Sequence, residues 1–443
     1  MMKLQFLYPV LLLSSLCSSL AMPGQSSTRR LYDKRNNDTE TDPMYQLSKD
    51  SDFHFEILRV LGFAPYEGSD IGEVLIAANQ IMPGDMESFH DAFHSIATIV
   101  DAQSMAIDET KNPTSARNAF FRASTYFRSA DFFLHGNWSD PRIYSLWDKQ
   151  LAAFTSAISL LPVPGERVVL KGDGFDIPAI FYSSGLPGPR PTIIMCNGYD
   201  GSQEEMYHFI GKAVNERGWN AITYEGPGQP TVRREQNLGF IPQWEKVVTP
   251  VVDYALTRPE VDPLAIGSIG ISFGGWLAPR AAAFEHRLVA TMALDGVYDF
   301  GPFILSKFGS YLESLFHSGN ATAFNSYIDE AVQDPNTTTS IRWAIQQGLW
   351  AFNAKTPFEW ISEIQPYTLS GLTQNISMPV FIGDSQNDIF FPGQAKALAE
   401  HLGDISTYHR FTNMEGAGEH CSTGAGVRQS QVVLDWFQNI IQT

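Results

Sequence analysis

One pentapeptide, Gly270-Ile271-Ser272-Phe273-Gly274, stands between a short apolar run from Ile266 and a glycine-rich helical pattern that reaches Arg280. This order predicts a strand, a sharp turn and a helix. A serine on such a turn is held in strained geometry that lifts its hydroxyl above the sheet, and the flanking glycines keep strand and helix from colliding. The pentapeptide therefore predicts a nucleophile, Ser272. The alternative is an ordinary turn whose serine caps the helix.

Around this turn, strand and helix patterns alternate. One β-hairpin is predicted, with strands at 167–170 and 177–182 joined by Gly172-Asp-Gly174, because a short glycine-rich turn of this kind joins antiparallel strands. Apolar runs then follow at 192–195, 221–224, 266–271, 289–294 and 380–382. A hairpin followed by strand–helix alternation predicts a mostly parallel, doubly wound α/β sheet with helices on both faces. Residues 300–375 break the alternation with aromatic-rich helical sequence, which predicts a cap inserted between strands.

The rest of the chain divides before the hairpin. Residues 1–21 combine Lys3, an apolar run and the small residues Ser19 and Ala21, which is typical of a signal peptide. Residues 22–48 are polar and predict a flexible lead-in. Residues 49–163 carry apolar side chains at three- and four-residue steps and predict an all-helical domain. The α/β domain then occupies 164–443.

A serine hydroxyl becomes a good nucleophile only when a histidine takes its proton and a carboxylate orients the histidine. In this architecture the partners follow the serine in the order acid, then histidine, each after a strand. Asp388, several residues past the strand at 380–382, is the predicted acid. Asp384 at the strand end is the alternative, and either could instead cap a turn.

Three histidines follow these acids. His401 falls in a helical pattern and His409 in the last predicted strand, whereas His420 ends a glycine-rich loop before the C-terminal helix. His420 is therefore the predicted base, with a plain polar loop residue as its alternative. Two backbone N–H groups are predicted to bind the oxyanion, that of Phe273 after the serine and that of Tyr199 in the loop after 192–195.

Composition narrows the class of protein. The chain has 443 residues with 44% hydrophobic and 12% aromatic content, which is typical of a globular protein. A formal charge of −18 disfavours nucleic acid and anionic membranes as partners, since both are bound through excess Lys and Arg. After removal of the signal peptide only Cys196 and Cys421 remain, so a disulfide scaffold is excluded; free buried thiols are favoured over one bridge.

Five glycosylation signals agree with secretion, because such acceptors are used in the secretory pathway. They lie at Asn37, Asn137, Asn320, Asn336 and Asn375. Together with the signal peptide they predict a secreted glycoprotein that is free of the membrane once the signal peptide is removed.

Other sites are less favoured. His90 and His94 share one helix face, but the pattern lacks the Glu of a zinc protease, and solvated or core histidines are more common. Cys421 beside His420 has no evident activating partner for thiol catalysis. No phosphate-binding or dinucleotide-binding loop is found. We therefore expect no metal and no organic cofactor.

Several stretches together resemble a group of α/β-hydrolases, namely fungal polyketide-shortening hydrolases of the yellowish-green pigment type and bacterial 2,6-dihydroxypseudooxynicotine hydrolase. The resemblance covers most of the chain after the signal peptide. Its stretches are Arg117-Asn-Ala-Phe-Phe-Arg-Ala-Ser-Thr-Tyr-Phe-Arg128, Asp140-Pro-Arg142, Asn197-Gly-Tyr-Asp-Gly201 with Glu204-Glu205, Glu225-Gly-Pro-Gly-Gln229, the Ser272 turn with Ala278-Pro-Arg-Ala281, Leu294-Asp-Gly-Val-Tyr298, and Glu415-Gly-Ala-Gly-Glu-His-Cys421.

The resemblance implies that the N-terminal helical domain folds over the active site. It also implies hydrolysis of a C–C bond next to a ketone, a retro-Claisen-type cleavage that uses Ser272, Asp388 and His420. Two departures are Glu225, where the group usually has Asp, and the signal peptide, which many relatives lack.

The N-terminal helical domain and the cap are both rich in aromatic residues and are expected to cover the active site. They favour a bulky, apolar small-molecule substrate, as in secondary-metabolite biosynthesis. Ester, lactone or amide hydrolysis, and acyl transfer or cyclisation, remain alternatives with the same triad. A non-catalytic binding protein is a lesser alternative. The oligomeric state is open, a homodimer included.

Overall fold

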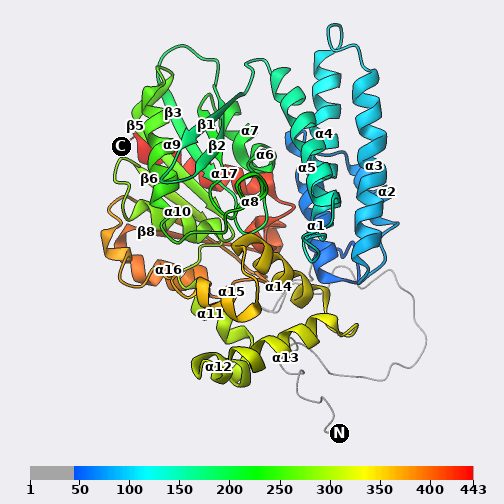
Figure 1. Cartoon of the computed structure of the whole chain (residues 1–443). Coiled ribbons are helices and arrows are strands. Elements are labelled where there is room, and N and C mark those ends of the chain that lie inside the picture. The colour runs from blue at the N-terminus through cyan, green and yellow to red at the C-terminus, as the bar shows by residue number, and fades with distance from the viewer. Residues whose placement is uncertain (1–43, 443) are drawn as a thin grey trace, which may run out of the picture.

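An eight-stranded sheet forms the centre of the computed structural model, which describes residues 44–442 (Figure 1). The strand order is β1-β2-β4-β3-β5-β6-β7-β8; β1–β2 and β2–β4 pair antiparallel, and the remaining neighbours pair parallel. The strands are β1 (Glu166–Lys171), β2 (Asp176–Tyr182), β3 (Arg190–Cys196), β4 (Asn220–Tyr224), β5 (Val261–Ile271), β6 (Ala290–Leu294), β7 (Val380–Ser385) and β8 (Ser406–Phe411).

The central strands are continuous apolar runs because helices cover both of their faces. All residues of β4 and β6 are buried, whereas the edge strands β1 and β8 are largely exposed or half-buried. Several strands are longer than the apolar runs that predict them, β5 and β7 among them. β5 starts five residues earlier, since Asp262, Pro263 and Leu264 lie near the surface and carry no apolar signal. β7 continues through Asp384 to Ser385, so Asp384 lies on a strand and not in the loop after it.

Five α-helices and the short helix η1 precede the sheet and form a block beside it (Figure 1). The first three α-helices begin at aspartates, Asp50, Asp70 and Asp85, whose carboxylates accept N–H bonds from the first turn. The helices of this block are α1 (Ser51–Gly62), η1 (Ala64–Tyr66), α2 (Ile71–Ala78), α3 (Met86–Ala106), α4 (Pro113–Asp131) and α5 (Arg142–Ser159).

The cap lies between β6 and β7 and contains five helices, at the bottom of the molecule in Figure 1. It touches the N-terminal helices, because Thr339 Oγ1 donates to Asp50 at 2.5 Å and the Ser340 hydroxyl donates to Asp52. The cap helices are α11 (Phe300–Lys307), α12 (Gly309–His317), α13 (Ala321–Gln333), α14 (Thr339–Phe352) and α15 (Pro357–Ile364).

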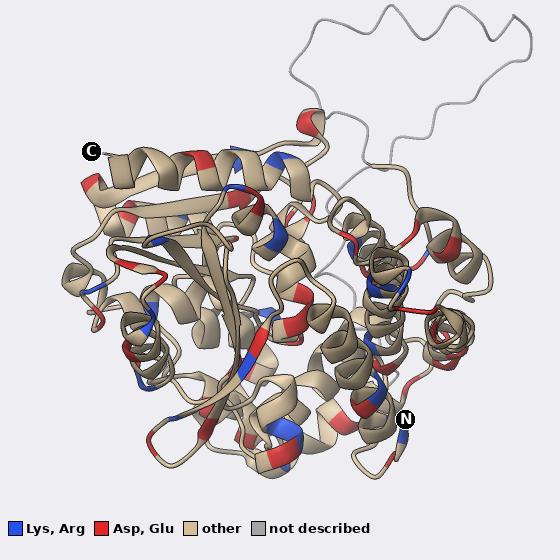
Figure 2. Cartoon of the chain, turned by 90° about the horizontal axis from the view of Figure 1, so that it is seen from above, with Lys and Arg blue, Asp and Glu red and all other residues tan. Residues whose placement is uncertain are grey.

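The remaining helices pack around the sheet. Figure 2, seen from above, shows acidic and basic residues mixed around the molecule and the C-terminal helix along one side of the sheet. These helices are α6 (Gln203–Met206), η2 (Tyr207–Gly211), α7 (Lys212–Glu216), α8 (Pro230–Gln236), α9 (Glu245–Thr257), α10 (Gly274–Ala282), η3 (Thr373–Asn375), α16 (Gln394–Leu402), η4 (Gly403–Ile405), η5 (Asn413–Glu415), η6 (His420–Ser422) and α17 (Gly426–Gln442).

Two apolar clusters hold these layers together. One joins the N-terminal helices to one face of the sheet, so that Phe53 and Phe127 belong to the same cluster as Met195 and Phe437. The other joins the opposite face of the sheet to the cap. The N-terminal helices and the cap each bury apolar side chains against one face of the sheet. Both parts of the fold are therefore held close to the sheet that carries Ser272.

Some sequence predictions concern residues outside the described range. The signal peptide (1–21), the Asn37 sequon and most of the lead-in lie there. The end of the lead-in is attached to the fold, since the Leu47 N–H donates to His54 Nδ1 at 3.1 Å. The sequon asparagines Asn137, Asn320, Asn336 and Asn375 are all exposed. Within residues 44–442, no helix has both the length and the apolar character needed to cross a bilayer.

Candidate active site

Ser272 lies on the tight turn between β5 and α10. Its φ is +57°, the left-handed region that non-glycine residues rarely adopt, and its N–H donates to the Leu294 carbonyl at 2.9 Å. The turn needs small neighbours. A Cβ on Gly270 would lie 1.9 Å from the Gly274 carbonyl oxygen, and one on Gly274 would lie 2.9 Å from that of Asn197. The sequence pattern therefore corresponds to a real steric requirement.

We expect Gly270→Ala to destabilise the protein by roughly 1–3 kcal/mol, because the added methyl meets backbone that cannot move away. Hydrolytic activity should also fall, since relief of the clash displaces Ser272. Thermal unfolding and ester hydrolysis check this result. Gly72→Ala on α2 is the matched control, because its added methyl meets only the Asp70 carboxylate at 3.4 Å. Equal melting temperatures for the two variants would contradict the steric account.

His420 connects the serine to a carboxylate. Its Nε2 lies 2.8 Å from Ser272 Oγ, and its Nδ1 lies 2.7 Å from Asp388 Oδ1. Asp388 Oδ1 also accepts the N–H groups of Phe390 at 2.8 Å and Phe391 at 3.1 Å. Burial alone would raise the pKa of Asp388, but the adjacent His420 and these hydrogen bonds hold it below its ordinary value. The three predicted residues thus lie in one chain of direct side-chain contacts.

The alternatives weighed from sequence lie elsewhere. Asp384 accepts a hydrogen bond from the Tyr408 hydroxyl on β8. His401 lies on α16 and stacks on Tyr298 at 3.9 Å between ring centroids, while His409 lies on β8. Within residues 44–442, none of these three alternatives forms a hydrogen bond or ion pair with Ser272.

A second carboxylate, Asp295, also reaches His420 and has no predicted role from sequence. Asp295 directly follows β6, and its Oδ2 lies 3.0 Å from His420 Nδ1. Its Oδ1 accepts the Ser385 N–H at 2.7 Å, and its Oδ2 accepts the Cys421 N–H. An acid directly after a strand that neighbours the serine strand was the signal available in the stretch Leu294-Asp-Gly.

The loop that carries Tyr199, one of the predicted oxyanion donors, contacts the serine turn at Gly198. A Cβ on Gly198 would be 2.9 Å from Phe273 N and 3.1 Å from Ser272 Cβ, so this loop contacts the serine turn. The Gly198 N–H is engaged by Asn197 Oδ1 at 2.7 Å. Among the described residues, the N–H groups of Phe273 and Tyr199 donate to no protein acceptor. These two N–H groups are therefore available to a bound carbonyl oxygen.

A buried ion cluster holds the loop that carries Tyr199. Arg59 Nη1 lies 2.9 Å from Asp200 Oδ1 and also pairs with Glu205, and Arg128 Nη1 lies 2.8 Å from Glu56 Oε2. Arg59 and Arg128 come from α1 and α4, whereas Asp200 and Glu205 follow β3. The N-terminal helices therefore hold Asp200, the residue next to the predicted oxyanion donor Tyr199.

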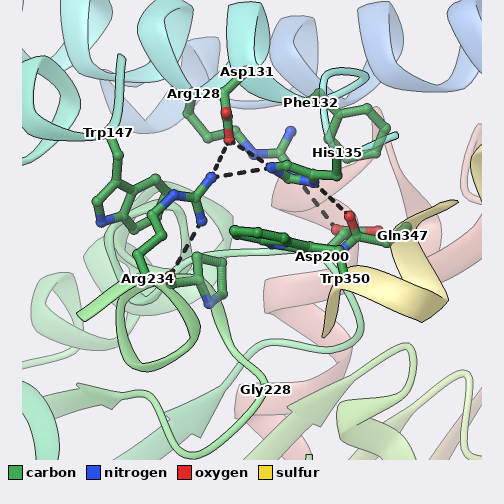
Figure 3. Close-up of a pocket in the computed structure, with 11 residues that line it drawn as sticks. Arg128, Asp131, Phe132, His135, Trp147, Asp200, Gly228, Arg234, Gln347 and Trp350 are labelled. Atoms are coloured by element: carbon green, nitrogen blue, oxygen red, sulfur yellow. Dashed lines mark hydrogen bonds and ion pairs between the residues drawn. The ribbon is translucent and has the colours of Figure 1, made fainter. Parts of the chain in front are cut away.

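A second polar chain reaches the same loop through the pocket of Figure 3. Arg234 Nη2 pairs with Asp131 Oδ2 at 2.5 Å, and Asp131 Oδ2 lies 3.1 Å from His135 Nε2. His135 Nδ1 lies 2.6 Å from Gln347 Oε1, and Gln347 Nε2 donates to the Tyr199 carbonyl at 3.0 Å. Helix α4, helix α8 and the cap thus meet at one side of the Tyr199 loop.

Aromatic rings surround the imidazole. The rings of Phe55 on α1 and of Phe390 and Phe391 after β7 lie 6.0, 4.8 and 5.9 Å from the His420 ring, centroid to centroid. Trp343 of the cap lies 6.1 Å from Phe390. His420 is 3% exposed, and Ser272 is partly exposed. The surroundings of the serine are therefore apolar and come from all three parts of the fold.

The two cysteines are free and buried. The Cys421 thiol donates to the Leu294 carbonyl at 3.6 Å, and burial raises its pKa to about 11. Cys421, Asp295 and His420 are close enough to form a metal-ligand set. A thiol that is protonated at neutral pH is a poor nucleophile, so Cys421 is not poised for thiol catalysis.

His420 has an unusual pKa. Burial would lower it, but the adjacent Asp388 carboxylate, with a smaller contribution from Asp295, raises it well above 6.5. A base must be neutral to accept the Ser272 proton, so we expect kcat/KM to rise with pH and to level off only above the ordinary histidine range. Ester hydrolysis followed in a pH-stat measures the profile. A half-maximum at or below pH 6.5 would contradict this expectation.

The sheet order and the serine turn after β5 define the α/β-hydrolase fold. No protein-family model matches the sequence. The 2,6-dihydroxy-pseudo-oxynicotine hydrolase structure superposes with a TM-score of 0.68 at 21% identity, covering 86% of this chain and 95% of that one. The AbyA5 structure superposes at 0.58 with 17% identity, covering 84% and 94%.

Curated relatives match along nearly their whole length. Hydrolase LUC6 of a Fusarium species is 30% identical over 417 residues, which are 89% of this chain and 97% of LUC6. The 20-hydroxy-prefusarin hydrolase FUS2 of Gibberella moniliformis is 29% identical over 418 residues, 89% of this chain and 98% of FUS2. The chain belongs to this family of fungal α/β-hydrolases, which confirms the predicted fold class and the predicted family.

Proposed function

We propose that the protein is a serine hydrolase in which Ser272 is the nucleophile, His420 the base and Asp388 the carboxylate that orients the imidazole. The observation that carries this proposal is the contact chain from Ser272 Oγ to His420 Nε2 at 2.8 Å and from His420 Nδ1 to Asp388 at 2.7 Å. It has the order and geometry of an acyl-transfer site. Ser272 is partly exposed, which is consistent with attack on a bound substrate.

In the proposed reaction, His420 Nε2 takes the Ser272 proton as Oγ attacks a substrate carbonyl. The N–H groups of Phe273 and Tyr199 bind the oxygen that becomes negative. The bond next to the carbonyl breaks, and His420 returns the proton to the leaving group. Water then attacks the acyl-serine as His420 takes one of its protons. The acid is released when the bond to Ser272 Oγ breaks and His420 returns this proton to Oγ. Every step uses this chain's own residues.

The proposed substrate is a bulky, apolar ketone of the polyketide type, cleaved at a C–C bond as in a retro-Claisen reaction. The aromatic residues Phe55, Phe390 and Trp343 support an apolar substrate, because the first two contact the His420 ring and Trp343 packs against Phe390. The name of the relative FUS2 refers to prefusarin, which places that enzyme in secondary metabolism. The same site could hydrolyse an ester, lactone or amide, or transfer the acyl group to a nucleophile other than water.

A matched pair of substrates tests the bond type. Purified protein is incubated with an aryl 1,3-diketone and with the ester of the same acyl group, and the products are separated by chromatography. C–C cleavage predicts a carboxylic acid and a methyl ketone from the diketone, with Ser272→Ala inactive on both compounds. Turnover of the ester alone would overturn the C–C assignment and leave the serine mechanism, whereas equal turnover by Ser272→Ala would overturn both.

We also propose that the protein is secreted and glycosylated. The support is the apolar N-terminus with its cleavage motif and the exposure of Asn137, Asn320, Asn336 and Asn375. Protein expressed in a fungal host should appear in the medium, begin near residue 22 and lose mass on enzymatic removal of N-glycans. Retention of the first 21 residues in an intracellular, unmodified protein would overturn this proposal.

A further inference from the structure

Two carboxylates converge on one nitrogen of His420. Nδ1 lies 2.7 Å from Asp388 Oδ1 and 3.0 Å from Asp295 Oδ2. Neither contact meets the full geometry of a hydrogen bond, so the imidazole is not committed to one carboxylate alone. We propose that Asp295 is a second positioning residue, which shares with Asp388 the orientation and charge stabilisation of His420. This inference rests on the proposed function of His420 as the base.

Asp295 is held in place by backbone groups of two other segments. Its Oδ1 accepts the Ser385 N–H at the end of β7, and its Oδ2 accepts the Cys421 N–H next to the base. Since β6 lies between β5 and β7 in the sheet, an acid at the end of β6 lies directly between the serine turn and the histidine loop. The carboxylate therefore ties together the three segments that the catalytic geometry depends on.

Backbone strain accompanies this contact. Asp295, Cys421 and Ser422 have φ values of +50°, +54° and +51° without being glycine. Such conformations cost energy and persist only where the surroundings hold them in place. Here the strained turn directs the Cys421 N–H toward Asp295 and the Ser422 N–H toward Ser385 Oγ at 3.3 Å. The loop is shaped to bring His420 onto Asp295 as well as onto Asp388.

The other groups around His420 do not supply this charge. Cys421 beside it is a thiol, and Glu419 points to Asn387, with 3.5 Å between Glu419 Oε1 and Asn387 Nδ2. Asp384 on β7 is engaged by Tyr408. Phe55 of α1 and the two phenylalanines after β7 cover the remaining faces of the ring. Asp388 and Asp295 are therefore the two carboxylates that contact the imidazole within residues 44–442.

The test compares Asp388→Asn, Asp295→Asn and the double variant with wild type. If the carboxylates share the task, each single variant loses about 10- to 100-fold in kcat, and the double variant approaches the roughly 10⁴-fold loss of a triad without its acid. Asp384→Asn is the matched control, because it removes a nearby carboxylate that does not touch His420. A full 10⁴-fold loss in Asp388→Asn alone would overturn the proposal.

A readout independent of turnover separates this proposal from the proposed function. The pKa of His420 is measured by NMR of protein labelled with ¹³C-histidine, with the signal assigned through His420→Gln. Loss of a carboxylate that faces the ring lowers this pKa, so Asp295→Asn should shift the titration to lower pH and Asp384→Asn should shift it less. A merely structural Asp295 would change the melting temperature and leave the titration of the folded fraction in place.

If Asp295→Asn does not fold, Asp388→Asn still decides the question. With Asp295 in place, the pKa of His420 in Asp388→Asn should stay above 6.5, and a value at or below the ordinary one would overturn the role of Asp295. If no ester or ketone is hydrolysed by wild type while the titration responds to both aspartates, the proposed function fails and the shared contact stands.

Discussion

Ser272→Ala should abolish hydrolysis while the protein stays folded. The hydroxyl makes its contact with His420 and takes little part in packing, so its loss removes the nucleophile without opening a large cavity. Removal of a triad serine costs up to about 10⁶-fold in kcat, and the remaining activity arises from the oxyanion donors and binding. Ester hydrolysis under saturating substrate and thermal unfolding of both proteins measure the two parts of this result.

Ser268→Ala is the control on the same strand. The Ser268 hydroxyl is buried and bonds to Thr291 Oγ1 at 3.0 Å, so its loss should cost about 1 kcal/mol of stability and leave activity largely intact. A Ser272→Ala protein with more than a few per cent of wild-type activity would contradict the assignment of the nucleophile. A parallel preparation of His420→Ala measures the activity of any contaminating hydrolase from the expression host.

The second large effect is on stability. Arg128→Met should lower the free energy of unfolding by about 3–5 kcal/mol, because Glu56 and Glu205 stay buried with Arg59 as their remaining partner. Glu56 already has a raised pKa, since burial outweighs the two arginines beside it. A carboxylate with a raised pKa destabilises the fold as pH rises through that pKa. The loss should therefore be larger at alkaline than at mildly acidic pH, as urea unfolding at the two pH values can measure.

Arg142→Met is the matched control for this variant. Arg142 pairs with Glu87 and Asp140, but it is 35% exposed and Glu87 is 62% exposed. Solvent screens such a pair, so its loss should cost less than about 1 kcal/mol. Equal losses in the two variants, or a loss in Arg128→Met that does not grow with pH, would contradict the interpretation of the cluster as the attachment of the N-terminal helices.

The features that the sequence predicts well have local causes. The serine turn is visible because Gly270 and Gly274 are required by contacts within a few residues. The strands β3 to β7 are visible because burial on both faces demands continuous apolar runs. His420 is identified because it is the one histidine after the two candidate acids that falls outside a predicted helix or strand. Sequence reasoning therefore reaches the fold class and the three residues that meet in the structure.

The features that sequence reasoning misses are contacts between residues that lie far apart along the chain. Arg59 and Asp200 are 141 residues apart and meet through the docking of helices on the sheet. Asp295 lies beside His420 because β6 is the neighbour of both β5 and β7, and sheet order is not written in any one motif. Glu225, a departure from the usual residue of the group, is buried and accepts the N–H of Gln203 at 2.9 Å. Each of these is a tertiary contact between segments with unremarkable local sequence.

The most direct test of the account is the site of covalent labelling by a fluorophosphonate, which reacts with a serine activated by a neighbouring base. Wild-type protein is treated with the probe, digested, and the labelled peptide identified by mass spectrometry. The account predicts a single label on Ser272, its absence in Ser272→Ala, and strongly slowed labelling in His420→Ala. A label on another residue, or an unlabelled wild-type protein that is folded, would contradict the claim that Ser272 is an activated nucleophile.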